Sequence, residues 1–230
     1  MTVSVAPERP ARRREPKPRR NWFATVLGVS LILAGLGFAL YFAWQYFGTN
    51  IVSKNRQAEI SQTLVQDWGK GLQGDSVGLM RIKRFGDDYE VPIVPGFDDD
   101  ALARGIGWDP KSEQPGEIGN FATAGHRVTH GEPFRDFLKL RKGDKVVVET
   151  RTNIYTYKLR GDGGDITVDF TVGWPLWPIP DPDAKGVKPT KAVITLLTCA
   201  ELFHTDNRNV VVGDLVATVD KGASTTASTG

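Results

Sequence analysis

The hydrophobic and polar positions divide the chain into stretches of clearly different pattern. Positions 22–47 are almost wholly apolar, and no charged residue occurs between Asn21 and Ser53. A helix over these 26 positions is about 39 Å long at 1.5 Å per residue, enough to cross a hydrocarbon core of roughly 30 Å with some tilt. The pattern therefore predicts a transmembrane anchor, with residues 21–48 as its bounds.

A cleaved signal peptide is the alternative to an anchor. Its apolar region is only about 7–15 residues long and ends at a small-x-small cleavage site, whereas this run ends in Tyr41-Phe-Ala-Trp-Gln45. Seven basic and two acidic residues precede the run. The positive-inside rule then predicts a cytoplasmic N-terminus, with everything after the anchor outside the cell. Residues 1–20, basic and rich in proline, are expected to be a disordered tail that contacts anionic membrane lipid.

Beyond the anchor the pattern changes first to a helical period and then to short alternating runs. Ile60, Leu64 and Trp68 are spaced at i, i+4 and i+8, which predicts an amphipathic helix over residues 51–68, within a juxtamembrane helix and linker at 49–77. Residues 78–220 follow as the main domain, and 221–230 as a flexible tail. The predicted strands, separated by turn residues, are 79–85, 89–93, 120–125, 145–149, 154–160, 165–170, 191–198 and 209–219, with a short helix at 134–140. This mainly β pattern favours a closed or nearly closed barrel.

Composition and charge exclude several classes of function. The 230 residues carry a net charge of +2, but residues 1–50 carry a net +5, and the remaining 180 residues carry a net −3 from 22 basic and 25 acidic side chains. A nucleic-acid-binding domain usually carries the positive charge itself, so we expect no nucleic-acid partner. The chain has one cysteine, which excludes an intramolecular disulfide and zinc sites of the Cys₄ or Cys₂His₂ type.

Three residues at strand ends are the best candidates for chemistry. Cys199 directly follows a buried-looking strand, although a lone cysteine is often a small packing residue. His126 also ends a strand-like run, after Gly125, and could instead be a buried histidine. Arg208 lies nine residues past Cys199, so two antiparallel strands joined by an eight-residue loop would bring the two side by side. The alternative for Arg208 is a surface ion pair.

These residues lie in motifs that resemble those of the sortases, the cysteine transpeptidases of Gram-positive bacteria. The segment Thr195-Leu-Leu-Thr-Cys199 is similar to the sortase signature Thr-Leu-x-Thr-Cys. Gly119-Asn-Phe-Ala-Thr-Ala-Gly-His-Arg127 resembles the histidine motif, and Asn207-Arg208-Asn-Val-Val the arginine strand. The resemblance covers roughly residues 78–219, is greatest to class E, the housekeeping type, and implies a closed eight-stranded β-barrel preceded by one transmembrane helix.

The resemblance also implies an activity and a set of partners. Cys199 would cleave a sorting signal between Thr and Gly through a thioacyl enzyme, Arg208 would hold the substrate and the oxyanion, and His126 would act as acid and base. Thr198 is expected to line the groove beside the thiol. The partners would be sorting-signal peptides of exported proteins, a cell-wall precursor or peptidoglycan amine, and membrane lipid; no cofactor is implied.

Several further residues have more than one interpretation. Class E sortases often have tyrosine where this chain has His130, and that tyrosine is associated with Leu-Ala-x-Thr-Gly signals, so both Pro- and Ala-containing signals stay open. Trp174 and Trp177, in an unusually apolar proline-rich loop, are expected to contact substrate or to cover the barrel. The His126-x-x-x-His130 spacing and the acidic groups at 98–100 and 162–165 suggest metal ligands, but a loop, a helix start and a hairpin turn are the favoured interpretations. We expect no metal site.

Two other classes of function stay open from the sequence. One is a membrane-anchored cysteine hydrolase that releases its acyl group to water. The other is a non-catalytic membrane-anchored β domain that binds peptides. Added amine separates the hydrolase from a transpeptidase, and alkylation of the thiol separates the binding domain from an enzyme.

Overall fold

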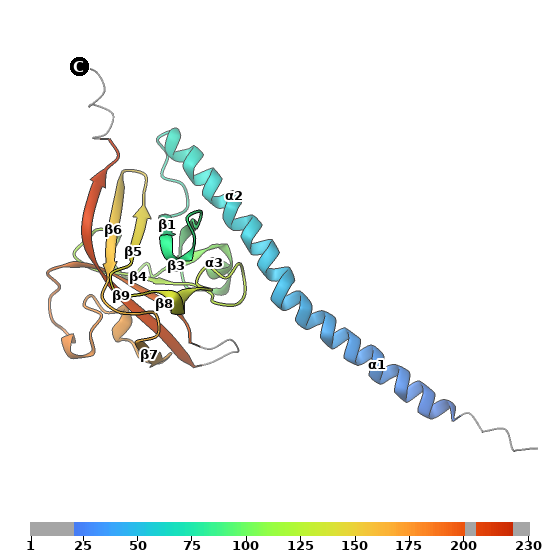
Figure 1. The fold of residues 1–230 in the computed structure, drawn as a ribbon. Coiled ribbons are helices and arrows are strands. Elements are labelled where there is room, and N and C mark those ends of the chain that lie inside the picture. The colour runs from blue at the N-terminus through green and yellow to red at the C-terminus, as the bar shows by residue number, and fades with distance from the viewer. Residues whose placement is uncertain (1–20, 201–205, 223–230) are drawn as a thin grey trace, which may run out of the picture. The chain divides into compact units, whose positions relative to one another are not determined.

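The computed structural model describes residues 21–200 and 206–222 (Figure 1). The two predicted tails lie largely outside these residues, and so does the third histidine, His204. The chain forms two compact units that divide after Phe42. The first contains all but the last residue of α1 (Trp22–Ala43), a helix that includes an 18-residue window of mean hydropathy 2.2 and is long and apolar enough to cross a membrane.

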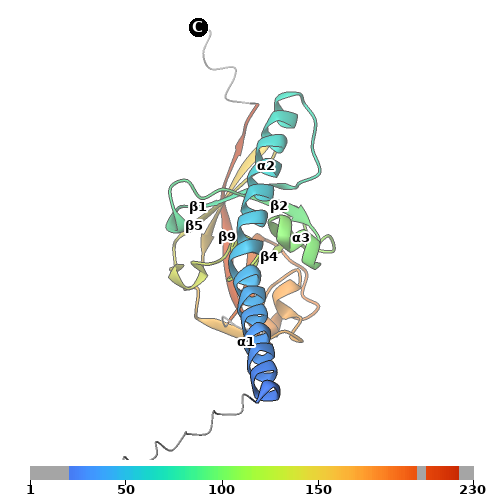
Figure 2. The same cartoon turned by 90° about the vertical axis from the view of Figure 1, so that its right-hand side faces the viewer.

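The second unit begins with a π-helical turn, η1 (Trp44–Gly48), and the predicted amphipathic helix, α2 (Thr49–Gly69). The buried stripe of α2 is mostly polar and consists of Ser53, Gln57, Ser61 and Leu64. The expected apolar stripe is therefore only partly right, because Leu64 is buried while Ile60 and Trp68 are half-exposed. Helix α2 lies along the barrel beside β2 and α3 (Figure 2).

Nine strands form one sheet in the described part of the chain. They are β1 (Gly78–Ile82), β2 (Val91–Pro95), β3 (Ile106–Trp108), β4 (Gly119–Ala124), β5 (Lys145–Glu149), β6 (Asn153–Leu159), β7 (Ile166–Asp169), β8 (Ala192–Cys199) and β9 (Asn207–Asp220). The order β6-β5-β1-β2-β3-β4-β8-β9 closes through pairing of β6 with β9, so the predicted closed eight-stranded barrel is confirmed.

The membership of the barrel differs from the eight predicted strands in two places. Strand β3 was not predicted, because three residues are too few to show an alternating pattern. The strand predicted at 165–170 forms as β7, but it pairs only with the first part of β9, outside the closed ring. Strand β9 achieves both pairings because its 14 residues reach past β7 to β6.

The helices of the barrel domain are short. They are α3 (Asp99–Arg104), η2 (Lys83–Phe85), η3 (Phe137–Lys139), η4 (Trp174–Leu176) and η5 (Pro182–Ala184). The helix predicted at 134–140 is a single 3₁₀ turn, η3. Asp98 caps α3 by accepting from the Ala101 N–H at 2.9 Å, and Asp165 accepts from the Asp162 N–H at 2.7 Å within a turn. The first group thus takes the predicted role at a helix start, whereas the second lies in a turn between β6 and β7, which do not pair with each other, so the predicted hairpin there is wrong.

Alternation along β8 separates an interior face from an outer face. Ile194 and Leu196 point into the main core of the barrel. Val193 belongs to a second cluster with Val210 and Val212, against which Leu197 packs. Because side chains two residues apart share a face of a strand, Cys199 lies on the outer face with Leu197, at the end of the strand.

Candidate active site

Cys199 and Arg208 are neighbours across the β8–β9 pair. Strand β8 pairs with β9 in an antiparallel register that places Cys199 opposite Arg208, as the sequence predicted. Directly opposed residues have their Cβ atoms about 4.5–5.5 Å apart on one face of the sheet. The thiol is half-buried, and the Arg208 guanidinium donates to the carbonyl oxygen of Asn207 at 3.0 Å. A cation with several N–H donors therefore lies on the same face as the thiol.

His126 follows the end of β4, at the same end of the barrel as Cys199 at the end of β8. Strand β4 runs parallel to β8 with Ala124 opposite Leu197, and the Gly125 N–H donates to the Leu197 carbonyl oxygen at 3.1 Å. His126 and Cys199 each lie two residues beyond this last matched pair. A Cβ at Gly125 would come within 2.8 Å of the Phe134 ring, so glycine is required here for close approach of the returning chain.

Thr198 and Arg127 join the two segments at this end of the barrel. The Thr198 hydroxyl donates to the Gly125 carbonyl oxygen at 2.8 Å, and the side chain is 3% exposed. Arg127 donates to the carbonyl oxygens of Cys199, at 3.4 Å, and Ala200. The buried Thr198 hydroxyl thus joins the ends of β4 and β8, and the expected place of Thr198 beside the substrate stays a prediction. Arg127 was not singled out from the sequence, although it directly follows the histidine.

His126 is an uncharged imidazole at neutral pH. Burial, and secondly the nearby His130, lower the pKa of His126 to about 4. Its Nε2 is buried and has no hydrogen-bond partner among the described residues. A neutral imidazole with an unused nitrogen can accept a proton from a thiol or an amine.

His130 lies against His126. The two rings stack with their centroids 4.7 Å apart and an interplanar angle of 30°. His130 has a φ of 53°, in the left-handed region, so the pair lies in a loop and not on a helix. In the part of the chain that the structure describes, no group of three His, Cys, Asp or Glu side chains could hold a metal ion.

The tryptophan loop covers the outer face next to this site. Trp174 packs on the cluster of Val193, Val210 and Val212, and Trp177 lies 5.8 Å from the Lys185 ammonium. Both belong to the segment after β7, and Trp174 shares its cluster with Leu197, two residues before Cys199. These contacts place Trp174 on the outer face of β8 and β9, and its contact with substrate stays a prediction.

Asn120 of β4 fixes this loop. Its amide donates to the carbonyl oxygens of Pro175 at 2.8 Å and Trp177 at 2.9 Å, and its Oδ1 accepts from the Thr195 hydroxyl at 2.8 Å. Asn120 is fully buried. Asn120 was not singled out from the sequence, although a lone amide within an apolar strand is a signal for a buried hydrogen-bond network.

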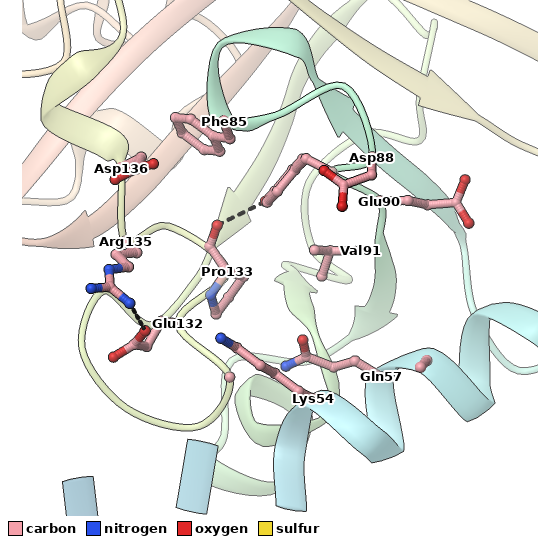
Figure 3. Close-up of a pocket in the computed structure, with 13 residues that line it drawn as sticks. Lys54, Gln57, Phe85, Asp88, Glu90, Val91, Glu132, Pro133, Arg135 and Asp136 are labelled. Carbon is pink, nitrogen blue, oxygen red and sulfur yellow. Dashed lines mark hydrogen bonds and ion pairs between the residues drawn. The ribbon is translucent and has the colours of Figure 1, made fainter. Parts of the chain in front are cut away.

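A cavity of about 400 Å³ lies between α2, the segment 85–91 and residues 131–136 of the loop that follows His126. Figure 3 shows Lys54 and Gln57 pointing from α2 toward Glu132 and Pro133 of that loop. Cys199, His126 and Arg208 do not line it. The cavity therefore marks the contact between helix and loop, and it lies apart from the three candidate reactive residues.

Comparisons with known proteins agree with the motifs. The family model described as "Sortase domain" matches residues 80–216. Sortase SrtE1 of Streptomyces coelicolor is 32% identical over 222 residues, which are 89% of this chain and 61% of that protein. Sortase SrtE2 of the same organism is 28% identical over 228 residues, with 90% and 87% covered. The chain thus spans less than two thirds of the length of SrtE1.

Solved structures show the same fold. Sortase E from Streptomyces avermitilis superimposes with a TM-score of 0.56 at 32% identity, covering 65% of this chain and 93% of that one. Sortase E1 from Streptomyces coelicolor, solved with a tripeptide in its active site, has a TM-score of 0.53 at 31% identity with the same coverage.

Proposed function

Because this chain belongs to the sortase family of cysteine transpeptidases, we propose that it is a membrane-anchored transpeptidase that attaches exported proteins to the cell wall. Its substrate is a Leu-Pro/Ala-x-Thr-Gly type sorting signal, cut between Thr and Gly. The observation that carries the proposal is the arrangement at one end of the barrel. There Cys199 of β8 lies opposite Arg208 of β9, and His126 follows the end of β4, which pairs with β8.

In the first half of the reaction Cys199 attacks the threonine carbonyl carbon. His126 accepts the thiol proton, the C–S bond forms, and the carbonyl oxygen becomes an oxyanion. The charged, planar Arg208 guanidinium stabilises that oxyanion and holds the substrate backbone. When the C–N bond breaks, His126 passes its proton to the departing glycine amine, which leaves a thioacyl enzyme.

In the second half an amine of the cell wall or its precursor attacks the thioester. His126 takes a proton from the attacking nitrogen, the new amide forms, and the C–S bond breaks with return of the proton to the Cys199 sulfur. The depressed pKa of His126 supports these steps, since the neutral form is the one able to accept a proton.

The substrate class rests on relatives and on the loop near the thiol. Sortase E1, a structural relative, holds a tripeptide in its active site, which supports a peptide substrate here. Trp174, which packs on the same valine cluster as Leu197, and His130, which stacks on His126, are proposed to contact the signal. His130 is the residue that we propose tunes the choice between proline and alanine in the signal.

The location is proposed from α1 and from the charge before it. Helix α1 is apolar and long enough to cross a membrane, and seven basic residues precede it. These features support a single-pass plasma-membrane protein with a cytoplasmic N-terminus and an extracellular catalytic domain. Protease added to intact cells should digest residues 51–230 and spare an epitope at the N-terminus. An N-terminal epitope that antibody reaches in intact cells contradicts this orientation.

The decisive experiment uses the full chain in detergent with matched Pro- and Ala-containing sorting peptides. Oligoglycine or a diaminopimelate-type amine is added, and products are followed by mass spectrometry. We expect a peptide–amine adduct that requires both the peptide and the amine. Release of the free acid at the same rate with and without amine indicates a hydrolase, and an unchanged peptide indicates a binding domain.

A further inference from the structure

The loop that carries both histidines adopts an unusual backbone conformation. Three consecutive residues lie in the left-handed region, with φ values of 53° at His130, 85° at Gly131 and 52° at Glu132. Left-handed conformations are unfavourable for residues with a Cβ, and they persist when surrounding contacts over-determine them. The contacts that hold this loop are therefore part of what places His126.

Asn50, near the start of α2, bonds this loop through both the oxygen and the nitrogen of its side-chain amide. Its Oδ1 accepts from the Gly131 N–H at 2.9 Å, and its Nδ2 donates to Glu132 Oε1 at 2.8 Å and to the Val128 carbonyl oxygen at 3.4 Å. One side chain thus contacts three residues of the loop. All three lie 78 or more positions away along the chain.

Gln57 reinforces the contact two helical turns later. It is 6% exposed, and its Nε2 donates to the His130 carbonyl oxygen at 3.1 Å. A Cβ at Gly131 would come within 2.6 Å of the Gln57 amide nitrogen, so the helix and the loop are in close contact there. Gln57 is one of the polar residues in the buried stripe of α2 that was expected to be apolar, and its bond to the loop explains why an amide is buried at that position.

We infer that Asn50 and Gln57 are positioning residues, through which the juxtamembrane helix holds loop 126–132 and, through it, the catalytic imidazole of His126. This inference rests on the proposed function for the role of His126. The loop closes on itself through the Phe134 N–H, which donates to the His126 carbonyl oxygen at 2.9 Å. A displacement at Gly131 is therefore transmitted to His126 over a short and closed segment.

The inference makes α2 a component of the active enzyme and not a spacer between anchor and barrel. A fragment that begins at residue 51 lacks Asn50, so the full chain in detergent is the material to test. A misplacement of about 1 Å in a catalytic group can reduce a rate by about 100-fold. We expect Asn50→Ala and Gln57→Ala to lower kcat by about 10-fold to 100-fold, while KM for the sorting peptide changes by less than about twofold.

Matched controls come from the exposed side of the same helix. Asn55→Ala and Gln62→Ala remove the same chemical groups from exposed positions of α2, and both should leave kcat and KM unchanged. Activity is expressed per folded enzyme, with the folded fraction measured by circular dichroism. If kcat per folded enzyme and the pH profile of kcat stay at wild-type values in both Asn50→Ala and Gln57→Ala, the inference is wrong.

An exchange of partners keeps the test valid if Asn50→Ala folds poorly. Asn50→Asp alone sets two carboxylates against each other and should be impaired. Combined with Glu132→Gln, it restores a donor and an acceptor in exchanged positions and keeps the acceptor for the Gly131 N–H. We expect the double variant to recover most of the lost kcat. A double variant that is no better than Asn50→Asp contradicts a role for this contact.

A measurement without turnover completes the test. In Asn50→Ala we expect the loosened loop to admit water, so the pKa of His126 should rise toward its ordinary value. NMR of the ring protons measures this pKa, and an unchanged pKa contradicts the inference. Cys199→Ala, assayed in parallel, separates the two proposals. If Cys199→Ala retains transfer activity the proposed function fails, whereas an inactive Cys199→Ala beside fully active Asn50 and Gln57 variants overturns only the positioning role.

Discussion

The thiol and the imidazole of this site are held by different kinds of structure. Cys199 and Arg208 lie on β8 and β9, whose pairing runs without interruption from Val193–Asp214 to Cys199–Arg208. His126 begins a loop whose contacts with the rest of the domain come largely from side chains, among them Asn50, Gln57 and Arg127. A backbone ladder does not depend on the identity of the side chains, whereas each of these loop contacts can be removed by one substitution.

This difference predicts where the site is robust and where it is sensitive. Substitutions on the strand pair should act only through the chemistry of the replaced group, because the strand pairing remains. Substitutions of residues that contact the loop should reduce the rate even though those residues do not contact substrate, because the substitutions change the position of His126.

Replacement of the nucleophile should have the largest effect. Cys199→Ala removes the only sulfur nucleophile of the chain, so both cleavage and transfer should be abolished. The midpoint of thermal unfolding should change little, because the half-buried thiol fills little volume and the β8–β9 ladder is retained. Mass spectrometry of the products and a thermal scan of the same sample provide the measurement. Substantial transfer by this variant contradicts the thioacyl mechanism.

Arg208 tests whether the strand pair supplies oxyanion stabilisation or only a surface charge. Arg208→Ala should lower kcat/KM by about 100-fold to 1,000-fold, which is typical for loss of one such donor. Arg208→Lys should recover only a small part of this loss, because an ammonium keeps the charge but lacks the planar pair of donors. Steady-state kinetics on the three folded forms decide it. Near-wild-type kcat/KM in the lysine variant means that the positive charge at position 208 is sufficient and that the paired N–H donors are not needed.

The buried histidine should make the stability of the domain depend on pH. The pKa of His126 is about 4 in the folded protein because of burial, against about 6.5 when unfolded. The unfolded chain therefore binds more protons between these values, so the free energy of unfolding falls as pH falls from 6.5 to 4. The full effect is on the order of 3 kcal/mol. Urea unfolding of wild type and His126→Gln at pH 7 and pH 4.5 measures it, and the variant should lose less stability.

The sequence predicted the strand pair better than it predicted the loop. Apolar alternation specified β8 and β9, and the spacing of nine residues was enough to place Cys199 opposite Arg208. The polar stripe of α2 could not be predicted, because Gln57 appears as a solvent-facing residue unless the loop that it contacts is known. Strand β3 was missed for a related reason, since its identity comes from its neighbours β2 and β4 and not from its three residues.

The smallest effect is expected at the far side of the loop, where Tyr89 donates from its hydroxyl to the Pro133 carbonyl oxygen at 2.8 Å. Burial raises the pKa of Tyr89, so the phenol remains a donor at every pH at which the enzyme is assayed. Tyr89→Phe keeps the ring and its edge contact with Phe85, and it removes one hydrogen bond worth about 1 kcal/mol. Since Asn50 and Gln57 still hold the loop, kcat should fall only a few-fold.

Tyr155→Phe, which removes a hydroxyl from β6, is the matched control and should leave kcat unchanged. If Tyr89→Phe lowers kcat as far as Asn50→Ala does, the loop is held equally from both sides, and the helix has no special part in placing His126.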